Sequence, residues 1–118
     1  MVSEAEKLRQ RTKSFALRIL KLFRSLPHAE DARILGRQLL RSGTGVAAKY
    51  RAACRSRSKA EFAAKIGVVV EEADETIFWL ELLLEAGIVH ADRLDGLLAE
   101  ANELVRIFSA SHRTAKRK

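Results

Sequence analysis

The sequence predicts an all-α protein whose helices pack as antiparallel neighbours in a bundle. Apolar residues recur at spacings of three and four along almost the whole chain, and no alternating strand pattern appears. The chain has one proline in 118 residues, and the short links between its later helices favour antiparallel packing of neighbours. With 47 % hydrophobic and 31 % charged residues, it has the composition of a single globular domain.

The first helix is predicted over residues 3–26. Ser3 and Glu6 form an S-x-x-E capping box at its start, and Pro27 ends it because the residue before a proline disfavours α geometry. The basic residues of this helix fall on two exposed faces. One face carries Lys7, Arg11, Arg18 and Lys21, and the other carries Arg9, Lys13 and Arg24.

The second helix is predicted over residues 30–55. At about 100° per residue, its arginines gather on one side along about 33 Å. We call this set the arginine ridge, which consists of Arg33, Arg37, Arg41, Arg51 and Arg55. Apolar residues such as Leu39 and Val46 fall on the opposite side, and their phase is the same before and after Gly43 and Gly45. This pattern predicts one continuous helix, in which Gly43 lets a neighbouring helix approach closely.

The third helix is predicted over residues 58–86, with a second capping box at Ser58 and Glu61. Its last part, IFWLELLL, is apolar on nearly every side, whereas a bundle covers only one side of each helix. We therefore expect another subunit to cover part of it. The predicted interface residues are Phe78, Trp79, Leu82 and Leu83. Asp74 lies close to the apolar stripe, so we expect it to be buried and paired with an arginine.

The fourth helix is predicted over residues 91–109 and completes a domain of residues 1–111. The remaining residues 112–118, HRTAKRK, are basic with a single apolar alanine, which predicts a disordered tail. The N-terminus is charged and lacks the apolar core of a signal peptide, and no apolar run is long enough to span a membrane. These features predict a cytoplasmic protein.

Charge is distributed unevenly along the chain, whose net charge is +7. Residues 1–65 hold 16 basic and 5 acidic residues, and residues 66–112 hold 2 basic and 10 acidic residues. Such asymmetry indicates an anionic partner for the first half of the chain. It fits equally well a basic face that docks on the acidic face of another copy.

Three segments carry a family resemblance: SFALRILKLFRSLP, RILGRQLLRSGTGVAAKYRAACRSRSKAEF and EEADETIFWLELLLEAGIV. They resemble the bacterial four helix bundle protein family, which is related to the ribosomal-RNA intervening-sequence proteins. The resemblance implies an up-down four-helix bundle that assembles into a homo-oligomeric ring, typically a pentamer, with no catalytic site. One departure is Ala48-Lys49-Tyr50, where family members usually have Asn before the tyrosine.

The wider family includes the accessory variability determinant of diversity-generating retroelements, a basic pentamer. That protein associates with a reverse transcriptase and with nucleic acid. The resemblance therefore implies a reverse transcriptase as one partner for this chain, besides further copies of itself and RNA or DNA.

Other chemistries find little support in the sequence. The stretch Gly43–Ala48 matches G-x-G-x-x-A, but a helix precedes it where a dinucleotide site needs a strand. The acidic residues of the third helix lack the Glu-x-x-His spacing of di-metal bundles. Cys54 has no histidine and acid arranged around it in any recognisable pattern, so we interpret it as a packed thiol. We expect neither an enzyme nor a cofactor.

The leading hypothesis is a non-enzymatic oligomer that binds RNA or DNA through backbone electrostatics. The arginine ridge would lead this binding, and the basic tail would assist it together with Arg11, Arg18 and Lys21. The alternative is a protein-interaction scaffold whose basic face docks on an acidic partner protein or on a neighbouring subunit, with no role in nucleic-acid binding.

Overall fold

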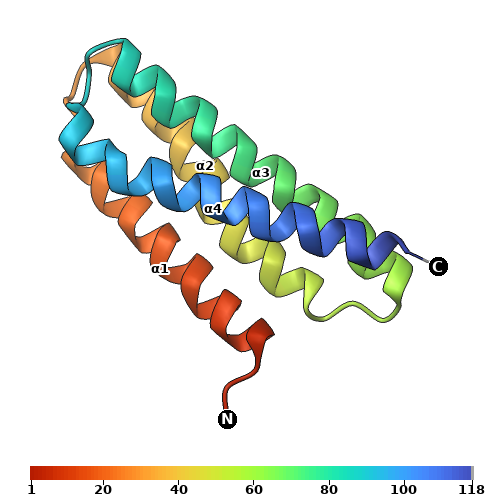
Figure 1. The fold of residues 1–118 in the computed structure, drawn as a ribbon. Coiled ribbons are helices and arrows are strands. Elements are labelled where there is room, and N and C mark those ends of the chain that lie inside the picture. The colour runs from red at the N-terminus through yellow and green to blue at the C-terminus, as the bar shows by residue number, and fades with distance from the viewer. Residues whose placement is uncertain (118) are drawn as a thin grey trace.

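The computed structural model describes residues 1–117, and these residues form four α-helices (Figure 1). The helices are α1 (Glu4–Ser25), α2 (Glu30–Ala53), α3 (Lys59–Glu85) and α4 (Ala91–Lys116). Consecutive helices run antiparallel, which confirms the predicted all-α, up-down bundle. The first three helices begin and end within two residues of the predicted bounds.

Local signals in the sequence set the ends of these helices. The Ser3 hydroxyl accepts a hydrogen bond from the Glu6 backbone N–H at 3.1 Å, and the Ser58 hydroxyl accepts one from the Glu61 N–H at 3.0 Å. Both predicted serine caps are therefore confirmed, whereas the glutamates bond elsewhere: Glu6 accepts from Arg9 and Gln10, and Glu61 accepts from the Arg57 N–H. Gly87 follows α3 with a φ of +72°, a backbone conformation that glycine adopts without a steric penalty.

The two glycines in the middle of α2 leave room for side chains from two different helices. A Cβ on Gly43 would lie 2.9 Å from the side chain of Ile19 on α1, and a Cβ on Gly45 would lie 2.4 Å from Glu72 Oε2 on α3. Any larger residue would push against one of these side chains. The predicted role of Gly43 in close helix approach is confirmed, and Gly45 has the same role on the side of α3.

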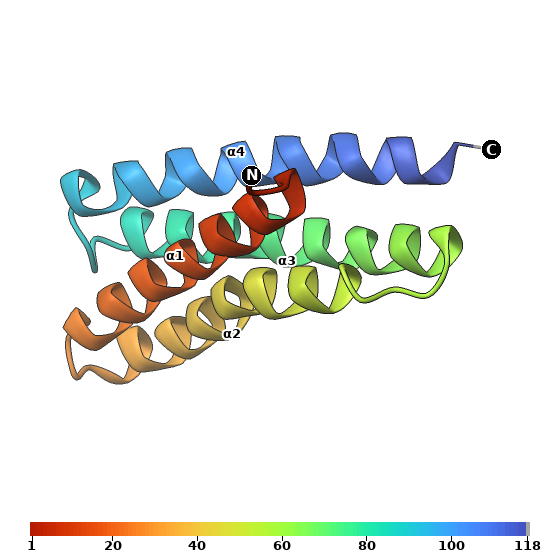
Figure 2. The ribbon, with the colours of Figure 1, turned by 90° about the horizontal axis from the view of Figure 1, so that it is seen from below.

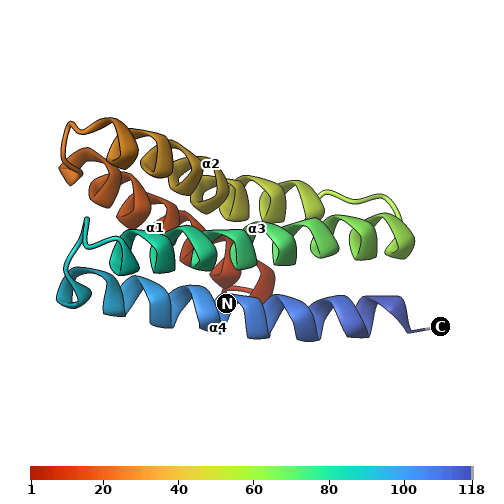
Figure 3. The same ribbon diagram turned by 90° about the horizontal axis from the view of Figure 1, so that it is seen from above.

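The four helices do not pack equally. Helices α2, α3 and α4 lie side by side over most of their length, whereas α1 crosses the group obliquely (Figures 2 and 3). The C-terminal end of α1 lies beside the start of α2 (Figures 2 and 3), and Arg11, in the first half of α1, contacts Glu100 of α4. The two N-terminal helices are therefore close at one end and separate toward the other.

The hydrophobic core runs between the helices and includes Phe15, Leu39, Leu80 and Phe108, all of them almost fully buried. Leu83, predicted to face another subunit, is 0 % exposed in this core, so that assignment is wrong. The assignment failed because a segment that is apolar on every side does not reveal which side is buried. Of the other predicted interface residues, Phe78 is 53 % exposed, and Trp79 and Leu82 are partly buried.

Helix α4 is longer than predicted, because it continues through Lys116 instead of ending at residue 109. The segment 110–116 contains no glycine or proline to end it, and His112 packs against Gly67 of α3. Lys59 Nζ also donates a hydrogen bond to the Arg117 carbonyl at 2.7 Å. Residues 112–116, expected to be part of a disordered tail, are thus helical, and Lys118 lies outside the described residues.

None of these helices, as far as residues 1–117 are concerned, is long and apolar enough to cross a membrane.

Candidate functional site

The arginine ridge does not form one uninterrupted surface. Arg41, in its middle, makes ion pairs with Glu75 and, at 3.8 Å, with Glu72, both on α3 of the same chain. Its guanidinium also contacts Gln38. The charge of Arg41 is therefore largely neutralised within the chain, and the ridge is divided into two groups of arginines.

Polar contacts hold α2 and α3 together along this side. Lys49 Nζ donates a hydrogen bond to Glu72 Oε1 at 2.8 Å, so the lysine that departs from the family pattern has a partner. Thr76 donates a buried hydrogen bond to Ser42 at 2.9 Å. The buried acid of α3 is Glu72, whereas Asp74 is exposed, so the sequence-based choice of Asp74 is wrong. A shift of two residues moves a side chain by about 200° around a helix.

The remaining ridge arginines lie exposed at the two ends of α2. Arg33 and Arg37 line a small hollow beside the turn between α1 and α2, of about 210 Å³. Arg51 and Arg55 line a larger cleft at the other end. None of these four arginines makes an ion pair within residues 1–117, in contrast to Arg41.

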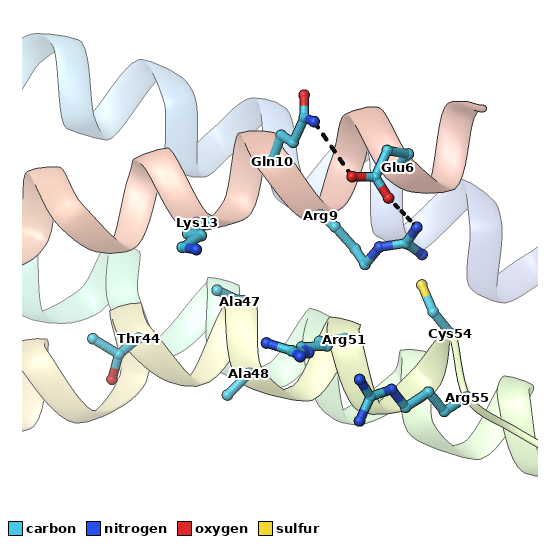
Figure 4. Close-up of a pocket in the computed structure, with 10 residues that line it drawn as sticks. All are labelled: Glu6, Arg9, Gln10, Lys13, Thr44, Ala47, Ala48, Arg51, Cys54 and Arg55. Atoms are coloured by element: carbon cyan, nitrogen blue, oxygen red, sulfur yellow. Dashed lines mark hydrogen bonds and ion pairs between the residues drawn. The ribbon is translucent and has the colours of Figure 1, made fainter. Parts of the chain in front are cut away.

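The larger cleft lies where α1 and α2 separate, and its volume is about 780 Å³. We call it the cationic cleft. Its α1 wall consists of Glu6, Arg9, Gln10 and Lys13, and its α2 wall of Thr44, Ala47, Ala48, Arg51, Cys54 and Arg55 (Figure 4). Small side chains on α2 leave room between the walls. Each wall carries two cations, so an anion in the cleft would be attracted from both sides.

The cationic cleft keeps most of its positive charge. Its one acid, Glu6, accepts hydrogen bonds from Arg9 and Gln10 on α1 (Figure 4). The bond from Arg9 lowers the pKa of the Glu6 carboxyl and raises the pKa of the Arg9 guanidinium. Lys13, like Arg51 and Arg55, makes no ion pair in the part of the chain that the structure describes.

The residues of α1 that the sequence suggests as assistants in nucleic-acid binding do not line this cleft. Arg11 makes two hydrogen bonds of 2.7 Å to Glu100 on α4, which raises the pKa of Arg11. Arg18 lies against Gly96 of α4, and Lys21 is exposed. It is the other basic face of α1 that provides Arg9 and Lys13 to the cleft. That face was visible in the sequence, but nothing there indicated which face would meet α2.

Cys54 lines the cleft at the C-terminal end of α2, and Tyr50 lies about one turn before it on the same helix. Cys54 is the only cysteine of the chain and is partly exposed, so it is less buried than expected for a packed thiol. Tyr50 is 4 % exposed, and its ring packs on Phe108 with a centroid distance of 4.9 Å. Burial raises the pKa of the Tyr50 hydroxyl.

The cleft has the chemistry of an anion-binding surface. Within residues 1–117, no group of three or more histidine, cysteine or acidic side chains is arranged to hold a metal ion. The side chains on the two walls can attract phosphates by charge and donate hydrogen bonds to them.

The fold and this surface together define a small all-α bundle with a cationic cleft between its first two helices. The chain belongs to the 23S rRNA-intervening sequence protein family, whose model matches residues 4–110. This confirms the family resemblance noted in the sequence.

One solved structure is similar to this chain with a TM-score of 0.83 and 28 % sequence identity. The match covers 88 % of this chain and 96 % of the other, a protein of unknown function from the S23 ribosomal protein family of Bacteroides thetaiotaomicron VPI-5482. The comparison with curated proteins gave no match. Neither the family nor the solved relative is described by a catalytic activity.

Proposed function

We propose that this chain is a non-enzymatic protein that binds the phosphate backbone of RNA or DNA in the cationic cleft. One observation carries the proposal: Lys13, Arg51 and Arg55 line the two walls of an open cleft and make no ion pair within residues 1–117. Cations without partners are free to replace the counterions of a phosphate chain. The family description, which refers to an intervening sequence of 23S rRNA, supports RNA as the ligand.

Such binding depends on charge and not on base sequence. Phosphate contacts position a protein on a nucleic acid, whereas specificity requires contacts to base edges. The cleft has no asparagine, and its one amide, Gln10, bonds to Glu6. We therefore expect similar affinity for different sequences and a strong decrease of affinity with salt.

The test is a fluorescence-anisotropy titration of labelled RNA and DNA at several salt concentrations. The variant Arg51→Glu/Arg55→Glu reverses two charges in the cleft. Its matched control is Arg106→Glu/Arg113→Glu, which makes the same change of net charge on exposed positions of α4. The cleft variant should lose most of the affinity. The slope of log K against log salt, which is negative, should become shallower by about 1.4 for single strands.

Two results would contradict the proposal. One is absence of binding at low salt by folded wild-type protein. The other is an equal loss of affinity in the α4 control, because the effect would then come from net charge and not from the cleft.

A second candidate function is assembly with further copies through α3. The specific observation is Phe78, whose ring is 53 % exposed and lies edge-on to Trp79 at 4.9 Å. Light scattering of Phe78→Arg tests this candidate, with Leu17→Arg as the matched control because Leu17 on α1 is 59 % exposed. Assembly through α3 predicts an oligomeric mass that only the Phe78 variant loses. A monomeric wild-type protein would exclude this candidate.

A further inference from the structure

The size of the cationic cleft indicates a ligand larger than one phosphate group. At about 780 Å³ it falls in the usual range of ligand sites, which is roughly 300–1,000 Å³. Its space comes from Thr44, Ala47 and Ala48, three small residues along one face of α2. Because the cleft lies between two helices, it is an elongated site with cations along both walls (Figure 4).

The cleft offers nothing on which a base could stack. None of its lining residues is aromatic. Tyr50 is buried against Phe108, and the indole N–H of Trp79 donates a hydrogen bond to Glu75 on α3. Proteins that hold the bases of single strands use exposed aromatic rings for this purpose. A nucleic acid in this cleft would be held by its phosphates, with its bases directed outward.

We infer that the cationic cleft takes one flexible chain of phosphodiesters, a single-stranded stretch of RNA or DNA, in preference to a duplex. This inference rests on the proposed function and specifies its ligand. A single strand can enter between the walls and meet Arg9 and Lys13 on one side and Arg51 and Arg55 on the other. A duplex is a stiff rod whose phosphates would meet the exposed rim and not both walls.

Cys54 provides a reporter inside the cleft. It is the only cysteine in the chain, it is partly exposed, and it lines the cleft beside Arg9 (Figure 4). A strand that enters the cleft would block access to its thiol. The rate of alkylation of Cys54 by N-ethylmaleimide therefore measures occupancy of the cleft itself, independently of total binding.

The experiment uses the full-length protein with a 20-nucleotide RNA of mixed sequence and with the same RNA annealed to its complement. Binding is followed by anisotropy and alkylation by intact mass, at equal phosphate concentrations. At about ten times the dissociation constant, the single strand should slow alkylation about tenfold, because only the unoccupied fraction reacts. The duplex should bind more weakly and leave the alkylation rate nearly unchanged.

The outcomes separate this inference from the proposed function. If neither RNA binds, the proposed function fails, and the inference fails with it. If both RNAs bind equally and Cys54 remains reactive, a backbone-binding surface exists outside the cleft and only the inference fails. Inorganic polyphosphate is the third arm: protection of Cys54 by polyphosphate but not by single-stranded RNA would also overturn the inference.

A neutral variant tests entry into the cleft without a change of charge. Ala48→Leu places a larger side chain in the cleft, and Ala52→Leu makes the same substitution at an exposed position of α2 outside the lining. We expect Ala48→Leu to lower single-strand affinity about fivefold, or about 1 kcal/mol, while Ala52→Leu binds like the wild type. Wild-type affinity in Ala48→Leu would show that the strand does not lie between the walls.

Discussion

Both sides of α2 carry basic side chains, but only those on one side are paired with acidic residues of the neighbouring helix. On the side of α3, Arg41 and Lys49 make ion pairs with Glu72 and Glu75. On the side of α1, Arg51 and Arg55 line an open cleft and make no such pair within residues 1–117. The first set joins two helices, and the second remains available to a ligand.

The difference comes from the neighbouring helices and not from α2. Helix α3 presents two acids to α2, and one of them is buried against Gly45. The first half of α1 presents only Glu6 to the cleft, and that acid is already paired with Arg9. A basic stripe on one helix therefore identifies a binding surface only when the positions of the acidic residues on the adjacent helices are known.

The largest effect should follow from breaking the ion pair on the α3 side. Lys49→Met leaves the buried carboxylate of Glu72 with only Arg41 at 3.8 Å, and we expect a loss of about 2 kcal/mol in the free energy of unfolding. The matched control on the other side is Arg51→Met, which should change stability by less than about 0.5 kcal/mol. Urea denaturation of both variants measures the difference.

A double variant checks the cause of that loss. Lys49→Met/Glu72→Met removes both partners, so no carboxylate is left buried with its main partner missing, and much of the stability should return. If the double variant is less stable than Lys49→Met alone, Glu72 contributes mainly through packing. Equal destabilisation in Lys49→Met and Arg51→Met would remove the distinction between the two sides.

A second prediction concerns Arg41, which would change from an ion-pair partner of α3 into a contact for nucleic acid. Glu75→Gln removes the closer of the two carboxylates that Arg41 pairs with, and we expect the guanidinium, left with Glu72 at 3.8 Å, to join the nucleic-acid surface. One additional phosphate contact would raise single-strand affinity by up to about fivefold at 0.1 M salt. Anisotropy titrations at several salt concentrations should also give a slightly steeper salt dependence.

The control for this second prediction is Glu81→Gln, which removes an exposed carboxylate of α3 that makes no ion pair in the described range. It changes the net charge equally without releasing Arg41. If both variants gain the same affinity, the gain reflects the charge of the whole protein. If neither gains, the position of Arg41 keeps it out of reach of the ligand even without its partner.

The sequence was sufficient to predict the helices because their end signals are local. Ser3, Pro27, Ser58 and Gly87 act through contacts within a few residues, and the structure confirms each of the corresponding helix ends. The end of α4 was missed because the contacts that hold it, such as the one between His112 and Gly67, come from a distant part of the chain.

The site was harder to predict because it depends on how each helix is rotated. Glu72 and Asp74 both neighbour Ala73 in the chain, and the last part of α3 is apolar on nearly every side, so the sequence pattern does not reveal which acid or which leucine is buried. Leu83 was therefore placed outside and Asp74 inside, whereas the structure buries Leu83 and Glu72. The oblique course of α1 likewise brings Lys13 to the cleft, although the sequence-based hypothesis selects the face of Arg11, Arg18 and Lys21.

The smallest effect concerns the one acid of the cleft and depends on pH. The hydrogen bond from Arg9 lowers the pKa of Glu6 in the folded protein below its ordinary value of 4.5. A lowered folded-state pKa means that the carboxylate stabilises the fold above the unfolded pKa, and that this contribution disappears as the pH falls through the folded value. Glu6→Gln lacks the contribution at every pH.

The urea midpoint of the wild type should therefore slightly exceed that of Glu6→Gln near pH 7, and the difference should shrink as the pH falls below 4.5. Glu71→Gln, which removes an exposed carboxylate of α3, controls for the loss of one negative charge. A difference that persists unchanged at pH 3 would show that Glu6 acts through the neutral hydrogen bond to Gln10. A difference confined to the higher pH values would mean that the charge of Glu6 is committed to Arg9, which leaves the other cations of the cleft to the ligand.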